Sequence, residues 1–170
     1  MSRLGIALAA ILLATGTAHA QHASASPYAG MEHRAVKALS DQQIADLRAG
    51  RGMGLALAGE LNGYPGPLHV IELADQLTLS AEQRHRVQEL FDAMKVEAKA
   101  VGEALIEQER ALDQAFAGRQ ISPASLDRLT AQIGETQGRL RAVHLKYHLT
   151  TAALLTEHQR HRYARLRGYL

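Results

Sequence analysis

The chain of 170 residues contains no cysteine and no tryptophan, and its other aromatic residues are two Phe and five Tyr. Without cysteine it forms no disulfide, no thiolate metal site and no cysteine nucleophile. The formal net charge of +2 is too small to indicate a nucleic-acid-binding protein. Because bulky aromatic side chains are scarce, the composition favours long, thin helices that pack against each other or against a second subunit.

Long apolar runs are also absent, apart from one at the start of the chain, MSRLGIALAAILLATGTAHA. Arg3 precedes the apolar run, and Ala18-His19-Ala20 follows it as a small-x-small cleavage pattern. This order predicts a secretory signal peptide over residues 1–20, removed after Ala20. The run is too short to span a bilayer comfortably, and no later stretch is long and apolar enough, so we expect no membrane insertion of the mature chain.

The rest of the chain divides into three parts. Residues 21–38 are small and polar, and we expect a disordered leader. Residues 39–66 form an N-terminal helical segment that is interrupted at AGRGMG, because three glycines fall within six residues. Residues 67–170 form the main helical domain, and Pro67 is predicted to occupy the first turn of a short helix over residues 68–77.

A Gly-rich segment, GMGLALAGELNGYPGP at residues 52–67, lies in the second part. It lacks the Gly-Lys-Ser/Thr ending and the preceding strand of a phosphate-binding loop. The segment is richer in glycine and more distinctive in sequence than an ordinary linker. We predict that it wraps the main helices or a dimer partner.

The strongest periodicity predicts one helix of about 35 residues that ends at Gly118. Ser122 and Pro123 then predict the start of a second long helix, as an N-cap and a first-turn proline. The fold class is therefore all-α, a long antiparallel helical hairpin with shorter flanking helices. The first predicted apolar stripe consists of Val87, Phe91, Met94, Ala98, Val101, Leu105, Leu112 and Phe116. The second consists of Leu126, Leu129, Ile133, Leu140, Val143 and Tyr147.

A pattern of Leu, Ser or Thr, two variable residues and Gln occurs three times, as LSDQQ, LSAEQ and LTEHQ. Each copy predicts a capping box, in which the hydroxyl and the Gln side chain satisfy each other's backbone N–H groups at a helix start. In the second and third copies an arginine stands where the partner of a hydrophobic staple belongs, so their leucines are predicted to pack on another helix. The residues of these two copies are Leu79, Ser80, Gln83, Leu155, Thr156 and Gln159.

The stretches LSAEQRHRV and LLTEHQRHRY resemble the two motifs of the LTxxQ family of periplasmic stress proteins, the Spy and CpxP group. The resemblance covers residues 68–169, and LSDQQ is interpreted as an ordinary helix cap. It implies a periplasmic location and a cradle-like homodimer of helical hairpins. It also implies an ATP-independent chaperone that binds unfolded envelope proteins during envelope stress, rather than an enzyme. No cofactor is required for that role.

The arginines and tyrosines of the C-terminal helix indicate a basic, partly apolar surface. Such a surface would attract acidic, unfolded client proteins. The alternative is a solvated helix end, where cations are favoured by the helix dipole. The residues in question are Arg160, Arg162, Tyr163, Arg165 and Arg167.

A sister branch of the same family resembles the CnrX-like periplasmic heavy-metal sensors, which bind metal through histidines on these helices. Here His144 and His148 stand one helical turn apart on one face, a half-site for zinc, nickel, cobalt or copper. His69 and Glu72 on the predicted short helix are the further candidate ligands. The sensor branch has a second histidine where this chain has Leu73.

In a chain with nine histidines, chance gives roughly half a pair at any one spacing, so the pair by itself is weak evidence for a metal site. The interpretation that His144 and His148 are solvated and bind no metal therefore stays open. The alternative function is a periplasmic heavy-metal-binding sensor or resistance protein. No catalytic set of residues is apparent, so an enzyme is not expected.

Overall fold

The computed structural model describes residues 26–170, so the predicted signal peptide and residues 21–25 lie outside the described part. Within residues 26–170 there is no β-strand, and only Val36 and Leu39 form an isolated β-bridge. The all-α prediction is confirmed. The helices are η1 (Met31–His33), α1 (Asp41–Ala49), α2 (Leu57–Glu60), α3 (Pro67–Glu72), α4 (Ala81–Ala117), α5 (Pro123–Leu154) and α6 (Glu157–Leu166).

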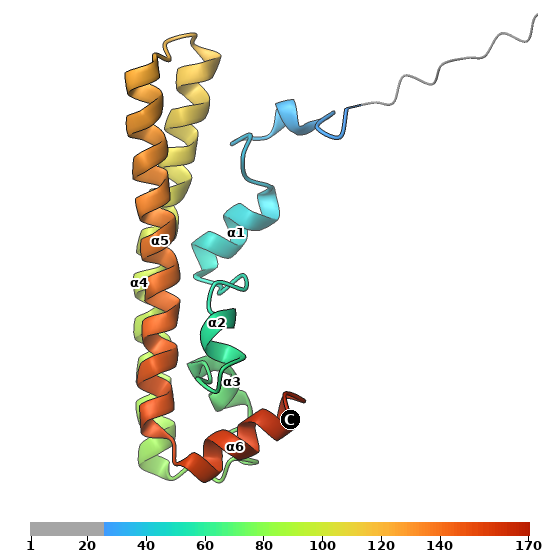
Figure 1. The fold of residues 1–170 in the computed structure, drawn as a ribbon, viewed down its shortest axis with the longest axis vertical. Coiled ribbons are helices and arrows are strands. Elements are labelled where there is room, and N and C mark those ends of the chain that lie inside the picture. Colours follow the sequence, from blue (N-terminus) through green and yellow to red (C-terminus); the bar gives the residue numbers. More distant parts are fainter. Residues whose placement is uncertain (1–25) are drawn as a thin grey trace, which may run out of the picture.

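The two long helices α4 and α5 run antiparallel and side by side as a hairpin (Figure 1). As predicted, Gly118 is the C-cap of α4, and Ser122 is the N-cap of α5, followed by Pro123. The left-handed residue of the turn is Arg119, with φ 53°, rather than the glycine. The predicted hairpin is therefore confirmed.

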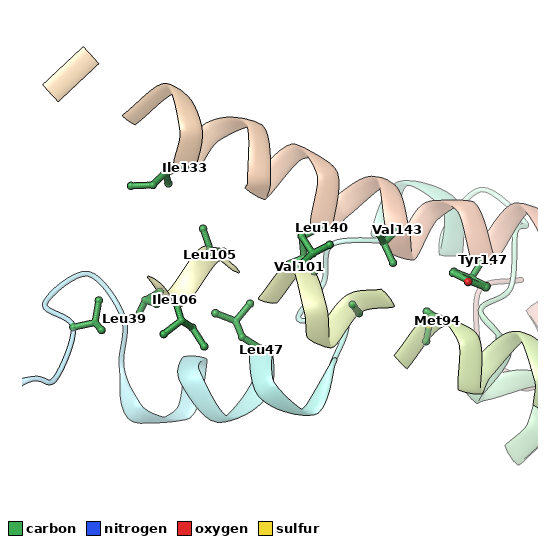
Figure 2. Close-up of a cluster of buried hydrophobic side chains, with 12 residues drawn as sticks. Leu39, Leu47, Met94, Val101, Leu105, Ile106, Ile133, Leu140, Val143 and Tyr147 are labelled. Carbon is green, nitrogen blue, oxygen red and sulfur yellow. The ribbon is translucent and has the colours of Figure 1, made fainter. Parts of the chain in front are cut away.

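The apolar stripes of α4 and α5 face each other and form the main core. Figure 2 shows Val101 of α4 and Leu140 of α5 meeting, with Leu47 of α1 closing the cluster from the other side. The prediction is wrong for Phe116, whose side chain is 53% exposed. Phe116 lies one residue before the end of α4, beside the turn, where the partner helix is only beginning.

The short helices pack along the hairpin and run toward its base (Figure 1). Helix α1 packs on α4, α2 on α5, and α3 on both long helices. The approach of α1 is so close that a Cβ on Gly102 would lie 2.7 Å from the carbonyl oxygen of Leu47. Helix α3 ends at Glu72, earlier than predicted, and the chain continues through turns in which Leu77 is fully buried.

All three predicted capping boxes are present, at the starts of α1, α4 and α6. Leu79 and Leu155 lie in one buried cluster with Val70 of α3 and Tyr163 of α6, as expected for leucines that pack on other helices. Helix α6 leaves the base of the hairpin and runs sideways from it, below α3 in this view (Figure 1).

Part of the segment assigned to a disordered leader packs on the core. Residues 26–38 include the helix η1, and Val36 is fully buried in the same cluster as Leu39 and Leu47. The apolar side chain of Val36 lies just before the Ser40 cap, where the chain turns onto the hairpin. The burial of Val36 in the core could not be predicted from the polar composition of this segment.

Candidate metal centre

The Gly-rich segment lies directly against α5, which confirms that it wraps the hairpin. A Cβ on Gly59 would lie 3.5 Å from the Cβ of His148, and one on Gly66 would lie 2.6 Å from Nε2 of the same histidine. The missing side chains therefore allow the backbone of the segment to approach the imidazole. Gly59 and Gly66 are explained by this contact, whereas Gly54 and Gly63 adopt positive φ values of 77° and 84° at turns.

A cavity of about 290 Å³ opens between the Gly-rich segment and the hairpin. Three of the four predicted ligands line it, namely His69 from α3 and His144 and His148 from α5. Glu72 does not line the cavity, and its Oε2 lies 2.9 Å from Nδ1 of His69. Within residues 26–170, no three His, Cys, Asp or Glu side chains lie close enough together to share one ion. The histidines therefore share a cavity without forming a closed ligand cluster.

His144 is 2% exposed, and its buried Nε2 has no hydrogen-bond partner. A Cβ on Gly52 would lie 3.9 Å from its Nδ1, so the Gly-rich segment also covers this ring. Burial, followed by the proximity of His148, lowers the pKa of His144. The imidazole is therefore held neutral, which is the form that binds metal ions. A buried ring nitrogen with no protein partner needs an explanation, and a bound ion is one that suits an imidazole lining a cavity.

His148 is held in one tautomer. Its Nδ1 lies 2.7 Å from the carbonyl oxygen of Tyr64, and because a carbonyl only accepts, Nδ1 must donate. In the neutral ring Nε2 then carries the lone pair, and the backbone of Gly66 packs against the Nε2–Cε1 bond, since a Cβ there would lie 2.6 Å from Nε2 and 2.7 Å from Cε1. Metal-binding histidines are commonly oriented in this way, by donating the other ring N–H to a backbone carbonyl.

Glu60 is a buried carboxylate at the wall of the same cavity, and the sequence analysis did not identify it. Oε1 accepts hydrogen bonds from the hydroxyls of Tyr163 and Tyr169, the latter at 3.1 Å. Oε2 accepts from the backbone N–H of Gly66 at 3.2 Å, and the guanidinium Nε of Arg167 lies 3.8 Å from Oε1. The only sequence signal is an isolated acidic residue within an otherwise uncharged Gly-rich segment.

The structure corrects the expectation for Tyr163, which was predicted to lie on a client-binding surface. Its side chain is 3% exposed, and burial together with the hydrogen bond to Glu60 raises the pKa of its hydroxyl. Arg160 donates to the carbonyl oxygens of Ala152 and Leu155. The remaining arginine positions of the prediction are Arg162, which is half-buried, Arg165, which is exposed, and Arg167, which faces Glu60.

The donor groups of the cavity fit a metal ion. Nε2 of His144 lacks a partner, Nδ1 of His148 is oriented by the Tyr64 carbonyl, and both rings line the cavity. Two imidazoles one turn apart on one helix suit zinc, nickel, cobalt or copper.

The fold and the cavity together define the kind of protein. It is a helical hairpin with histidines lining a cavity between the hairpin and the Gly-rich segment. The chain belongs to the heavy-metal resistance family, which it matches over residues 55–162. This family is related to the CnrX-like and Spy/CpxP-like periplasmic proteins. The matched region contains Glu60 and the three cavity histidines. Comparison with curated proteins and with solved structures finds no significant match.

Proposed function

We propose that this protein is an exported heavy-metal-binding protein, a periplasmic sensor or resistance protein. The observation that carries the proposal is His144, a buried neutral imidazole whose Nε2 has no partner, one turn from a second oriented imidazole. Membership of the heavy-metal resistance family supports the same role. Within the part of the chain that the structure describes, no helix combines the length and hydropathy that a bilayer crossing needs.

His144 and His148 would hold the ion, and His69 on α3 is the further candidate. A bound metal ion would link α5 to the elements that cover it. Tyr64 orients the His148 ring through its carbonyl, and the lack of a side chain at Gly66 allows the ring to hold this position. Because the cavity exists only when the Gly-rich segment is docked, binding stabilises the docked form by RT ln(1 + c/Kd), where c is the free ligand concentration, so the effect grows with the logarithm of that concentration.

The chaperone role implied by the Spy and CpxP resemblance is the alternative. The heavy-metal resistance family favours metal binding over it. A chaperone would suppress the aggregation of a reduced client at stoichiometric levels without ATP, and its arginines would have to act without the buried Tyr163. A cradle-like homodimer, unfolded envelope proteins as partners and the absence of enzymatic activity stay predictions.

Calorimetric titration of the purified protein with zinc, nickel, cobalt and copper tests the proposal. We expect at least one metal to bind at micromolar affinity or tighter, and binding to be lost in the His144→Ala, His148→Ala double variant. The matched control is His158→Ala with His161→Ala, an exposed pair on α6 that should leave binding unchanged. Unchanged binding in the His144 and His148 variant would remove both residues as ligands.

A further inference from the structure

The cavity has an unusual balance of donor atoms. Its lining residues include three histidines and two methionines, Met53 and Met94, but only one carboxylate, Glu60. Imidazole and thioether groups are intermediate and soft donors, whereas divalent zinc, nickel and cobalt readily take oxygen ligands. Which metal the cavity prefers therefore depends on whether the Glu60 carboxylate is free to coordinate it.

The Glu60 carboxylate already accepts hydrogen bonds from groups of the protein. Both of its oxygens accept hydrogen bonds, from Tyr163 and Tyr169 at Oε1 and from the Gly66 amide at Oε2. Withdrawing it to a metal would leave the hydroxyl of Tyr163, which is 3% exposed, without a partner. An unpaired buried hydroxyl is costly, so Glu60 is a poor candidate for coordination.

Met94 is placed as a donor from the opposite helix. It lies on α4, is 7% exposed, and lines the cavity together with His144 and His148 of α5. Met53 lines the cavity from the Gly-rich segment and adopts φ 44°, a strained conformation for a non-glycine residue. Both methionines therefore line the same cavity as the two α5 imidazoles.

We propose that the cavity selects a soft monovalent cation of the Cu(I) and Ag(I) class, held by His144, His148 and Met94. This inference rests on the proposed metal-binding function and specifies its metal. Thioether donors favour Cu(I), which accepts a low coordination number, whereas a structural zinc site needs four donors. No group of three His, Cys, Asp or Glu side chains is assembled within residues 26–170, and two imidazoles with one thioether meet the smaller demand.

The first experiment compares metals and variants. Ag(I), and Cu(I) kept reduced in a chelator competition, are titrated into the purified protein beside zinc, nickel and cobalt. We expect the monovalent ions to bind about 100-fold more tightly than zinc, a difference of about 2.8 kcal/mol. Met94→Leu, which conserves volume, should weaken Ag(I) binding by about tenfold or more and leave zinc binding unchanged. Met31→Leu is the matched control, because Met31 lies in η1 and does not line the cavity.

A second readout does not depend on a variant. Methyl-labelled methionine NMR on the unsubstituted protein should show the Met94 signal shifting on addition of Ag(I), while the Met31 signal stays in place. A shift of Met53 with Met94 unmoved would overturn the assignment of Met94. Zinc binding as tight as Ag(I), with no effect of Met94→Leu, would overturn the soft-metal inference but leave the proposed function standing. The absence of binding by all five metals would overturn both.

Discussion

Gln83 and Gln159 exchange two side-chain hydrogen bonds of 3.0 Å across the base of the hairpin. Each amide oxygen also accepts the backbone N–H of its own helix cap, Ser80 or Thr156. The remaining amide protons reach the carbonyl oxygens of Leu154, at 2.9 Å, and Leu77, at 3.4 Å. The repeated motif therefore does more than start two helices, because its glutamines join the end of α5 to the start of α4.

We expect Gln83→Ala and Gln159→Ala each to lower the free energy of unfolding by about 1–3 kcal/mol, because each leaves a partly buried amide without its partner. The double variant should cost less than the sum, with a coupling energy of about 0.5–3 kcal/mol. Chemical denaturation of the four proteins measures this cycle. Gln43→Ala is the control, since Gln43 is exposed and serves only its own cap. It should cost about 0.3–1.5 kcal/mol. Strict additivity of Gln83 and Gln159 would contradict the shared role.

Glu60 is the buried junction between the Gly-rich segment and α6. Glu60→Gln should lower the free energy of unfolding by about 1–3 kcal/mol, because an amide NH₂ in place of Oε2 cannot accept the hydrogen bond from the Gly66 N–H. Tyr163→Phe should cost about 1–3 kcal/mol by leaving the carboxylate short of a donor. Thermal and chemical unfolding measure both variants.

Tyr28→Phe is the comparison for these variants, since Tyr28 is 72% exposed and should be neutral within about 0.5 kcal/mol. Equal effects of Tyr163→Phe and Tyr28→Phe would show that the buried hydrogen bond contributes nothing.

Gly66 has φ −79°, which any residue adopts, so Gly66→Ala tests contact rather than backbone strain. Its new Cβ would lie 2.6 Å from Nε2 of His148 and would force the ring to move. We expect a loss of stability of about 1–3 kcal/mol. We also expect metal affinity to fall by about tenfold or more, because the displaced ring loses the orientation that the Tyr64 carbonyl gives it.

Gly138→Ala is the matched control for Gly66→Ala. A Cβ on Gly138 meets nothing within 4 Å, so it should stabilise α5 by about 0.5–1 kcal/mol and leave metal affinity intact. Calorimetry on both variants decides the point. Undiminished metal binding in Gly66→Ala would place the ion away from His148.

Glu109 on α4 is 9% exposed, and burial raises the pKa of its carboxyl above the ordinary value of 4.5. The unfolded chain releases this proton more readily than the folded chain does. Stability from this group is therefore complete below pH 4.5 and is lost as the pH rises through the raised pKa. Glu109→Gln should raise the melting temperature at neutral pH, with the gain vanishing below pH 4.5.

Circular dichroism melts over a series of pH values measure this gain. Glu107→Gln, at a side chain that is 61% exposed on the same helix, should show no such pH-dependent gain. A constant difference between Glu109→Gln and the unsubstituted protein at every pH would show that Glu109 does not titrate differently on folding.

Features that depend on neighbours in the chain could be predicted from the sequence. The capping boxes, the Gly118 stop, the Pro123 start and the facing stripes of α4 and α5 all follow from local hydrogen bonding and helical period. The same applies to His144 and His148, whose spacing alone puts them one turn apart. The signal peptide is a further sequence-level prediction, at residues outside the described part.

The cavity could not be predicted in this way. Glu60, Met94 and Tyr169 are far apart in the chain, and nothing in their local sequence says that they line one space. The exposed fraction of Phe116, the early end of α3 and the burial of Val36 also depend on which element happens to cover each residue.

The sequence by itself determined an all-helical chain with a long hairpin and the starting points of its helices, because caps and stripes act over a few residues. Only the tertiary structure decided that the glutamines of two motifs bind each other, and that the Gly-rich segment covers His144 and His148. The physical reason is that these contacts form only when the hairpin closes. Closure brings together donors and acceptors separated by 76 positions for Gln83 and Gln159, and by 84 for Tyr64 and His148.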